Sequence, residues 1–308
     1  MLKTAIADII KLAFLYSARY TLPLLPIRLV WTLAECAGFV SYTLNDKKGK
    51  AIKSELKKML GERFTDKELK TVLRRSFVNS IKSHFETWTF PKLNREKTAK
   101  MSYFSGMEHL DESLKKGKGA IILLSHFGAY KFVLPALGYM GYKINQMAVK
   151  PTIWKDGTMI RDKFMDIESE NEKKIPAKFI YIEESLKPVF KALMNNEIVV
   201  MSIDSLLGSG RVPYGFFNNT ILFNNTPMML SLRIGSPLIP TFIVRQKDDK
   251  HKIIFEKPLV AGHEIKEDVA VKNLTGDFAA LFEKYFMESP WQYATYLPEL
   301  RKNKLLVN

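Results

Sequence analysis

The chain has 308 residues, which is enough for one large α/β domain or two smaller ones. With 46% hydrophobic and 26% charged residues it is globular, which excludes a disordered chain and a multi-span membrane protein. Its net charge of +15 favours anionic partners such as nucleic acid, anionic lipid or an acidic carrier protein. The single cysteine, Cys36, excludes an internal disulfide and a cysteine-built zinc site, and it fits exposure to the cytosol.

Two apolar segments, residues 5–18 and 26–44, are predicted to form helices near the start of the chain. Lys11 interrupts the first segment, and Arg28 and Glu35 interrupt the second. A charge near the centre of a membrane-spanning helix costs roughly 2.5–3.5 kcal/mol, and no cleavage site of the signal-peptide kind follows. The pattern therefore favours helices that lie in or on a membrane interface. The alternative is that both helices simply pack on the domain.

We assign residues 1–46 to N-terminal membrane-associated helices, and residues 47–308 to a basic helical lead-in, up to residue 105, followed by an α/β domain. Strands are predicted at residues 120–124, 144–149, 179–182, 198–203, 238–245 and 252–256. Helices are predicted at residues 114–118, 132–137, 155–170, 184–194, 227–234 and 268–287. This alternation predicts a largely parallel or mixed sheet flanked by helices. Residues 208–226 break the alternation with an irregular loop rich in Gly, Asn and Phe, of the kind that often carries function.

One histidine has a sequence context that suits catalysis. The apolar run 120–124 leads into Ser125-His126-Phe127-Gly128, and an apolar helical pattern follows. A strand, a turn and a helix in this order expose an imidazole at the edge of a sheet, where it can act as a general base. The alternative is a structural histidine. The other histidines occur in helical or surface-like contexts, at His84, His109, His251 and His263.

Several other site types are excluded by their missing motifs. No spacing of His, Asp and Glu matches a metal site, so we expect no metal. The chain also lacks a Gly-rich phosphate loop and a G-x-S-x-G elbow, which argues against nucleotide binding and serine hydrolase chemistry. We therefore expect no bound cofactor.

Six segments follow one another in a characteristic order: Gly106-Met107-Glu108, residues 119–128, Val199-Val200-Met201-Ser202-Ile203-Asp204, Val212-Pro213-Tyr214-Gly215-Phe216-Phe217, Gly235-Ser236-Pro237-Leu238-Ile239-Pro240 and Ser289-Pro290-Trp291-Gln292-Tyr293. In this order they resemble the lysophospholipid acyltransferase superfamily, and specifically its lipid A acyltransferase branch. The resemblance covers most of the chain, up to about residue 301. It implies transfer of a fatty acyl group from a thioester to a hydroxyl or amine of a membrane lipid.

The resemblance also implies a His-x4-Asp/Glu motif, in which the acid orients the histidine. His126 matches the base, but Lys131 occupies the position of the acid. A carboxylate accepts the imidazole N–H and stabilises the imidazolium, and an ammonium does neither. Three interpretations remain open. Another carboxylate, with Asp204 the best candidate by its family position, replaces the acid; Lys131 is neutral or binds substrate; or the protein has lost ordinary turnover.

Further site residues are implied by the same resemblance. Lys150 and Arg161 follow the histidine at places where family members carry cations, and they would contact phosphate or the developing oxyanion, together with backbone N–H groups near Gly128. Arg211 is a further phosphate candidate, and for each of these three cations the alternative, which is favoured for each taken singly, is a solvated surface position. Phe216 and Phe217 are expected either to line an acyl pocket or to belong to the core.

These observations favour an acyltransferase at the cytoplasmic face of the cell inner membrane, peripheral or anchored by its N-terminal helices. The acyl donor would be an acyl carrier protein, whose acidity suits a basic surface, or acyl-CoA. The first alternative is a non-catalytic lipid or acyl-carrier binding protein that keeps the fold, which Lys131 favours. The second is nucleic-acid binding, which rests on charge alone and lacks a recognition motif.

Overall fold

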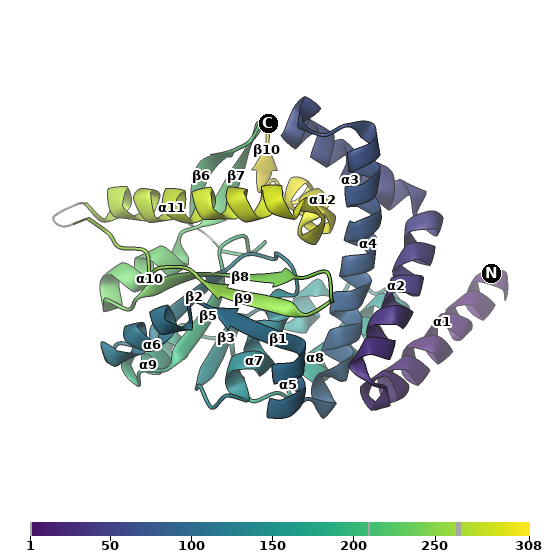
Figure 1. Cartoon of the computed structure of the whole chain (residues 1–308), viewed down its shortest axis with the longest axis horizontal. Helices are drawn as coiled ribbons and strands as arrows, with labels where there is room; N and C mark the ends of the chain where they lie inside the picture. Colours follow the sequence, from purple (N-terminus) through teal and green to yellow (C-terminus); the bar gives the residue numbers. More distant parts are fainter. Residues whose placement is uncertain (1, 209, 263–265) are drawn as a thin grey trace.

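A computed structural model of the chain describes residues 2–208, 210–262 and 266–308, and within them the side chains from residue 12 onward; His263 lies outside these ranges. Among the described residues, a central sheet has the strand order β1-β9-β8-β2-β5-β3-β4 (Figure 1). Its strands are β1 (Ser102–Ser105), β2 (Ala120–Leu124), β3 (Ile144–Ala148), β4 (Lys178–Tyr181), β5 (Ile198–Ser202), β8 (Leu238–Arg245) and β9 (His251–Phe255). Adjacent strands are parallel except for the β8–β9 pair. The mixed α/β architecture expected from the sequence is therefore confirmed.

Helices cover both faces of this sheet and one of its edges (Figure 1). They are α1 (Leu2–Thr21), α2 (Ile27–Leu44), α3 (Asp46–Leu60), α4 (Asp66–Thr89), α5 (Arg95–Met101), α6 (Met107–Lys115), α7 (Val133–Gly138), α8 (Met159–Glu172), α9 (Lys187–Met194), α10 (Thr226–Ile234), α11 (Glu267–Glu288) and α12 (Leu297–Lys302). Helix α6 begins and ends earlier than the predicted helix at 114–118. Strand β1 was not predicted.

The core lies on the two faces of the sheet, and β2 shows how its sequence divides between them. All five of its residues are buried. Ile121 and Leu123 belong to a cluster that includes Phe278 and Phe282 of α11, while Ile122 and Leu124 belong to the opposite cluster with side chains from α5, α6 and α7. Because successive side chains of a strand point to opposite faces, a continuous apolar run is required wherever both faces are covered.

Residues 208–226 contain a β-hairpin, and the prediction of an irregular loop over this segment is wrong. β6 (Arg211–Phe216) and β7 (Asn219–Asn224) pair antiparallel, and β10 (Leu306–Val307) joins β7 to complete a second sheet. The two strands are joined by Phe217 and Asn218, and Phe217 has a φ of 54°. Tight hairpins usually place Gly or Asn at such a position, so a phenylalanine there conceals the turn in the sequence.

Helix α2 belongs to the folded domain along one of its faces. Gly38 lies where α2 crosses α4, and a Cβ atom added to it would come within 2.6 Å of the Val78 Cα atom. The Trp31 indole N–H of α2 donates to the Glu86 carboxylate of α4 over 2.6 Å. The packing alternative, which the sequence left open, therefore describes this face of α2.

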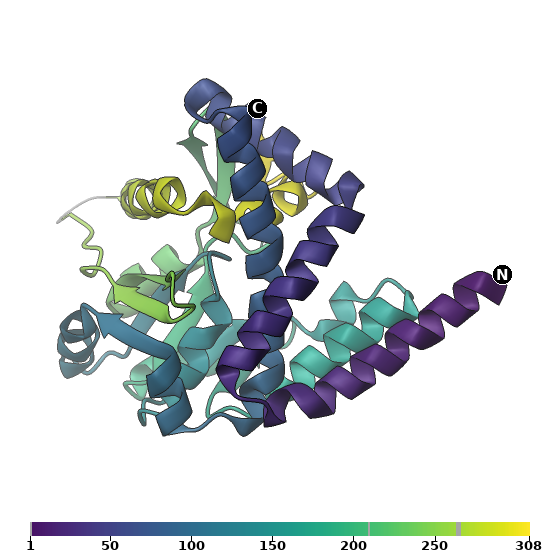
Figure 2. The ribbon, with the colours of Figure 1, turned by 45° about the vertical axis from the view of Figure 1, so that its right-hand side comes forward.

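The other face of the N-terminal region is exposed and apolar. Helix α1 projects from the body of the molecule alongside α8 (Figure 2), where Arg19 of α1 pairs with Glu170 of α8. Phe14 of α1 is 62% exposed, and Leu24, between α1 and α2, is 72% exposed. Among the described residues, no helix has the length and apolar character needed to cross a membrane.

Candidate active site

His126 and Asp204 are brought together by the register of two parallel strands. Leu124, the last residue of β2, pairs with Ser202, the last residue of β5. His126 and Asp204 each lie two residues beyond these strand ends. Because parallel strands in register end at the same edge of a sheet, His126 and Asp204 emerge side by side there.

The two side chains make a close and directional contact. The Nδ1 atom of His126 lies 2.8 Å from the Asp204 Oδ1 atom, and the backbone N–H of His126 donates to Asp204 Oδ2 over 2.8 Å. Asp204 is fully buried, whereas the His126 side chain is 23% exposed. Since a carboxylate accepts, Nδ1 carries the proton, and the Nε2 atom is left as a lone-pair acceptor with no hydrogen-bond partner among the described residues.

Two tyrosines complete the surroundings of this pair. The Tyr293 hydroxyl donates to Asp204 Oδ2 over 2.8 Å, so this carboxylate accepts three hydrogen bonds. The Tyr296 ring stacks on the His126 ring with centroids 4.4 Å apart, and its hydroxyl donates to the Asp204 carbonyl oxygen over 3.2 Å. Burial, followed by the charge of Asp204, raises the pKa of both tyrosines well above the usual value. Both hydroxyls therefore stay protonated and act as donors.

The turn after His126 depends on Gly128. Its φ is +64°, and a Cβ atom there would come within 2.0 Å of the Ile243 carbonyl oxygen. Its backbone N–H donates to the Gln292 carbonyl oxygen over 3.0 Å. The Gly128 N–H is thus occupied within the fold, and the contact of backbone N–H groups near Gly128 with an oxyanion stays a prediction for the neighbouring residues. Glycine is required here because the backbone of β8 passes so close.

Lys131 faces α8. Its Nζ atom lies 2.6 Å from Glu172 Oε1 and 3.2 Å from Glu168 Oε2. Although burial opposes the charge, these two carboxylates hold the pKa of Lys131 well above its usual value. The interpretation of a neutral Lys131 is therefore wrong. His84 of α4 also contacts Glu168, over 2.7 Å. Glu168 therefore joins α8 to α4 and to the turn that carries Lys131.

The three other cations expected from the resemblance differ in their position. The Arg211 guanidinium donates to the Ser205 carbonyl oxygen over 2.8 Å, next to Asp204 in the chain. Lys150 pairs with Glu184 over 2.9 Å, and Arg161 pairs with Asp156. Both of those side chains are exposed, and no described contact joins either to His126. Of the three, Arg211 has the described contact nearest to the histidine and aspartate pair.

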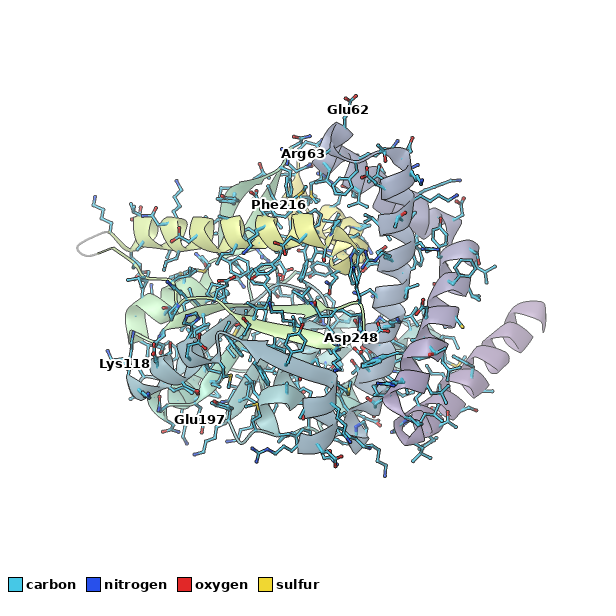
Figure 3. All side chains as sticks on the ribbon, viewed as in Figure 1. Glu62, Arg63, Lys118, Glu197, Phe216 and Asp248 are labelled. Carbon is cyan, nitrogen blue, oxygen red and sulfur yellow. The ribbon has the colours of Figure 1, made fainter. Side chains whose placement is uncertain are left out.

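Phe216 lies beside α11 (Figure 3), and neither Phe216 nor Phe217 lines a described cavity. Phe216 is fully buried and stacks on Phe282 with centroids 5.1 Å apart. Phe217 is half-buried in the hairpin turn, with the Arg63 guanidinium 5.3 Å from its ring centroid. The structure thus favours the core alternative for both phenylalanines.

Comparison with known protein families agrees with this site. A family model described as bacterial lipid A biosynthesis acyltransferase matches residues 8–302. The chain belongs to this family. A comparison with curated protein sequences found no match. The family is one of acyltransferases, and the resemblance drawn from the six segments is confirmed.

The tyrosines are the site residues that the sequence did not single out. Tyr293 lies in the last of the six segments that carry the family resemblance, and Tyr296 follows three residues later. Aromatic residues near the end of a chain are common in cores, and only the path of the chain after α11 shows that these two reach His126 and Asp204.

Proposed function

We propose that this protein transfers a fatty acyl group from an acyl thioester to a hydroxyl or amine of a membrane glycolipid of the lipid A kind. The observation that carries the proposal is the contact between His126 and Asp204, within a chain of the lipid A acyltransferase family. A buried carboxylate on Nδ1 fixes the tautomer that leaves Nε2 free to take a proton.

The proposed reaction is a direct transfer. His126 Nε2 takes the proton of the acceptor hydroxyl or amine as its oxygen or nitrogen attacks the thioester carbonyl, and Asp204 stabilises the imidazolium that forms. The C–S bond breaks as the new C–O or C–N bond is completed, and the sulfur leaves with the proton held by His126. No covalent enzyme intermediate and no metal is required.

The oxyanion formed in this reaction needs donors other than the Gly128 N–H. In the part of the chain that the structure describes, the backbone N–H groups of Phe127 and Ala129 make no hydrogen bond, which supports them as the donors. Arg211 is the cation whose described contacts support a role near the acceptor phosphate or the oxyanion. Lys150 and Arg161 would act only if their ion pairs with Glu184 and Asp156 exchange for a ligand.

The donor is proposed to be an acyl carrier protein or acyl-CoA, since both are anionic and the chain carries a net charge of +15. The exposed apolar side chains of α1 and α2 support work at the surface of the inner membrane, on its cytoplasmic side, where acyl thioesters are made. The alternative of a binding protein without catalysis rested on Lys131. The contact of Asp204 with His126 supplies the carboxylate that Lys131 cannot.

The proposal is tested by measuring thiol release from acyl-CoA or acyl carrier protein in the presence of lysolipid and underacylated glycolipid acceptors. Wild-type protein should release many thiols per chain, well above the single background thiol that Cys36 adds to the measurement. His126→Ala and Asp204→Asn should each lower the rate by roughly 10³-fold or more. His109→Gln is the control, because the His109 ring binds the Phe255 carbonyl oxygen and not Asp204. Acceptor-dependent release at the wild-type rate by His126→Ala would reject the mechanism.

A further inference from the structure

A groove of about 580 Å³ lies between α2, α4 and the turn that joins β8 to β9. In Figure 3 the label of Asp248 marks this turn beside α4. Residues of all three elements and Trp291 line the groove. Neither His126 nor Asp204 is among the lining residues, so the groove is separate from the catalytic pair.

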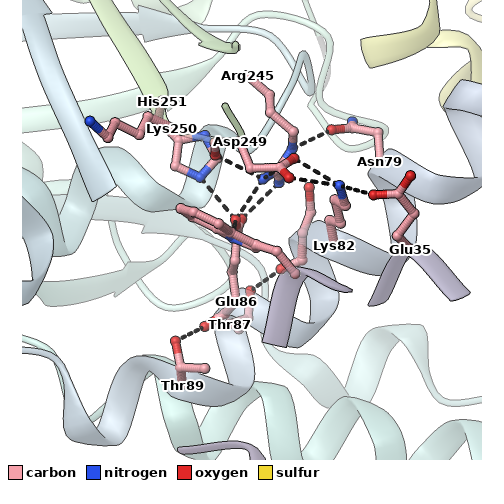
Figure 4. A network of polar contacts seen from close by, with 12 residues as sticks. Glu35, Asn79, Lys82, Glu86, Thr87, Thr89, Arg245, Asp249, Lys250 and His251 are labelled. Carbon is pink, nitrogen blue, oxygen red and sulfur yellow. Dashed lines mark hydrogen bonds and ion pairs between the residues drawn. The ribbon is translucent and has the colours of Figure 1, made fainter. Parts of the chain in front are cut away.

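The floor of the groove is a network of ion pairs in which every acid is already bound (Figure 4). Arg245 donates to both oxygens of Glu86, over 2.6 and 2.8 Å. Lys82 binds Asp249 over 2.8 Å and Glu35 over 3.0 Å. Each carboxylate of this network is thus already paired with a cation.

Three cations line the groove above this floor: Arg74, Arg75 and Lys247. All three residues are exposed, and none of their side chains makes an ion pair or a hydrogen bond in the part of the chain that the structure describes. Burial and the neighbouring charge of Arg74 lower the pKa of Arg75, whose guanidinium lies 4.1 Å from the centroid of the Trp291 ring. An anion placed here would relieve this repulsion and bind two forked donors.

Helix α2 contributes apolar side chains to the groove beside Glu35 and Cys36, and these apolar side chains continue onto open surface. Phe39 is 50% exposed and Val40 is 51% exposed, and both line the groove from α2. Leu33, about two helical turns before Val40, is 42% exposed, and Leu44, about one turn after it, is 77% exposed. These apolar side chains thus lead into an exposed row along α2, which suits hydrocarbon and not a free polar anion.

We propose that this groove binds an anionic phospholipid, with its headgroup phosphate on Arg74, Arg75 and Lys247 and its acyl chains along the exposed face of α2. The occupant is amphiphilic because the groove combines unpaired cations with apolar side chains that continue onto open surface. The site is distinct from the proposed acyl-transfer site and does not depend on the reaction there.

Cys36 makes the proposal directly measurable, because this single cysteine is exposed and lines the groove. The experiment follows alkylation of Cys36 in the full chain by a maleimide, with and without monomeric dihexanoylphosphatidylglycerol. Bound lipid should slow alkylation by about fivefold or more at saturation. Dihexanoylphosphatidylcholine and inorganic phosphate, at the same concentrations, should give less than half of this protection.

The variant Arg74→Gln/Arg75→Gln should bind phosphatidylglycerol about tenfold more weakly, since two charge-assisted contacts are lost. Lys115→Gln/Lys116→Gln is the matched control: it removes the same charge from exposed positions at the end of α6, on the other side of the molecule (Figure 1), and should stay within about twofold of wild type. Lys247→Gln, on the exposed turn, should weaken phosphatidylglycerol binding about threefold. It replaces the double variant in the test if the double variant does not fold.

Three results would overturn the proposal. Equal protection by the phosphatidylcholine would show that the headgroup charge is not recognised. Equal protection by inorganic phosphate would identify an anion site with no lipid selectivity. Unchanged phosphatidylglycerol binding in the folded variants would remove the cations from the site. Because the measurement uses alkylation, His126→Ala should behave as wild type, and the two proposals can fail separately.

Discussion

At the scale of single residues, the proposed catalytic pair shows how a carboxylate can reach a histidine from another position in the fold when the motif position carries a different residue. A histidine that acts as a general base is oriented by a carboxylate on its second ring nitrogen. The fold can present this carboxylate from the neighbouring strand of the sheet as well as from the turn that follows the histidine. Asp204 does this from the end of β5, where the His126 backbone N–H and the Tyr293 hydroxyl hold its second oxygen. The position five residues after His126 is then free for another task, which Lys131 performs on α8.

This assignment predicts that restoring an acid at position 131 is harmful. In Lys131→Glu a third carboxylate would face Glu168 and Glu172, which lie 3.2 and 2.6 Å from the present ammonium. We expect a loss of roughly 3–5 kcal/mol in the free energy of unfolding, with no gain in acyl transfer, because Asp204 already occupies Nδ1 of His126. Thermal and urea unfolding measure the first effect, and thiol release measures the second.

Lys115→Glu is the control for that change in charge, since Lys115 is exposed and has no described ion pair. Its free energy of unfolding should stay within about 0.5 kcal/mol of the wild-type value, and its rate of acyl transfer should stay within about twofold. A Lys131→Glu protein that is as stable as wild type and turns over faster would show that the original motif position still serves His126.

How much of the site could be predicted depends on how local its signals are. His126 could be singled out because an apolar strand, a turn and a helix are adjacent in sequence, and Asp204 because of its position in the family resemblance. Tyr293 could not be found, since its role arises from a contact across 89 residues that no spacing rule describes. Nor could the pairing of Lys131 with Glu168, for which the distance in sequence is 37 residues.

At the scale of secondary-structure elements, fully buried strands were the most predictable part of the fold. β2 and β8 have the predicted bounds, because an apolar run that is buried on both faces is distinctive. The hairpin of β6 and β7 was missed because its turn carries Phe217, where Gly or Asn is usual. β1 was missed because it has only four residues, of which one is buried.

The tie between Lys131 and α8 predicts a specific acid sensitivity. Burial opposes the charge of Glu168, but Lys131 and His84 lower the pKa of its carboxyl from 4.5 to about 2. A lowered pKa means that the stabilisation is present above pH 4.5 and is lost as the pH falls toward 2. The shift corresponds to about 3 kcal/mol of unfolding free energy at neutral pH.

Urea unfolding at pH 5, 4 and 3 would measure this contribution. Glu168→Gln should be less stable at pH 5 and should lose less stability than wild type between pH 5 and pH 3, because its amide does not titrate. Glu170→Gln is the control on the same helix: Glu170 is 52% exposed and pairs with Arg19, so its variant should keep the wild-type slope. Parallel slopes for Glu168→Gln and wild type would contradict the assignment.

At the scale of the whole molecule, the N-terminal region has a structural role that a simple truncation would confuse with its proposed role in membrane binding. Removing residues 1–44 would take away the Trp31 indole that binds Glu86, and it would uncover the face of α4 on which α2 packs. Loss of membrane binding by such a protein would therefore report misfolding as readily as a missing anchor. Point substitutions on the exposed face separate the two roles.

The exposed apolar side chains predict how the protein meets a membrane. Phe14 and Leu24 bury little surface within the fold, at 62% and 72% exposure, so Phe14→Ser/Leu24→Ser should change the unfolding free energy by less than about 1 kcal/mol. Inserting two such side chains into lipid contributes roughly 1.5–3 kcal/mol each. The double variant should therefore bind vesicles of mixed phosphatidylglycerol and phosphatidylcholine at least about 30-fold more weakly.

The net charge of +15 adds a second component, which salt should separate from the first. Raising the salt from 0.1 to 0.5 M should weaken the binding of wild type and variant by a similar factor, because screening acts on charges and not on apolar contacts. Met194→Ser/Val260→Ser is the matched control: these side chains are 77% and 78% exposed, and α9, which ends at Met194, lies on the other side of the molecule from α1 (Figure 1). If vesicle sedimentation falls equally in both double variants, the N-terminal face is not the surface that enters the membrane.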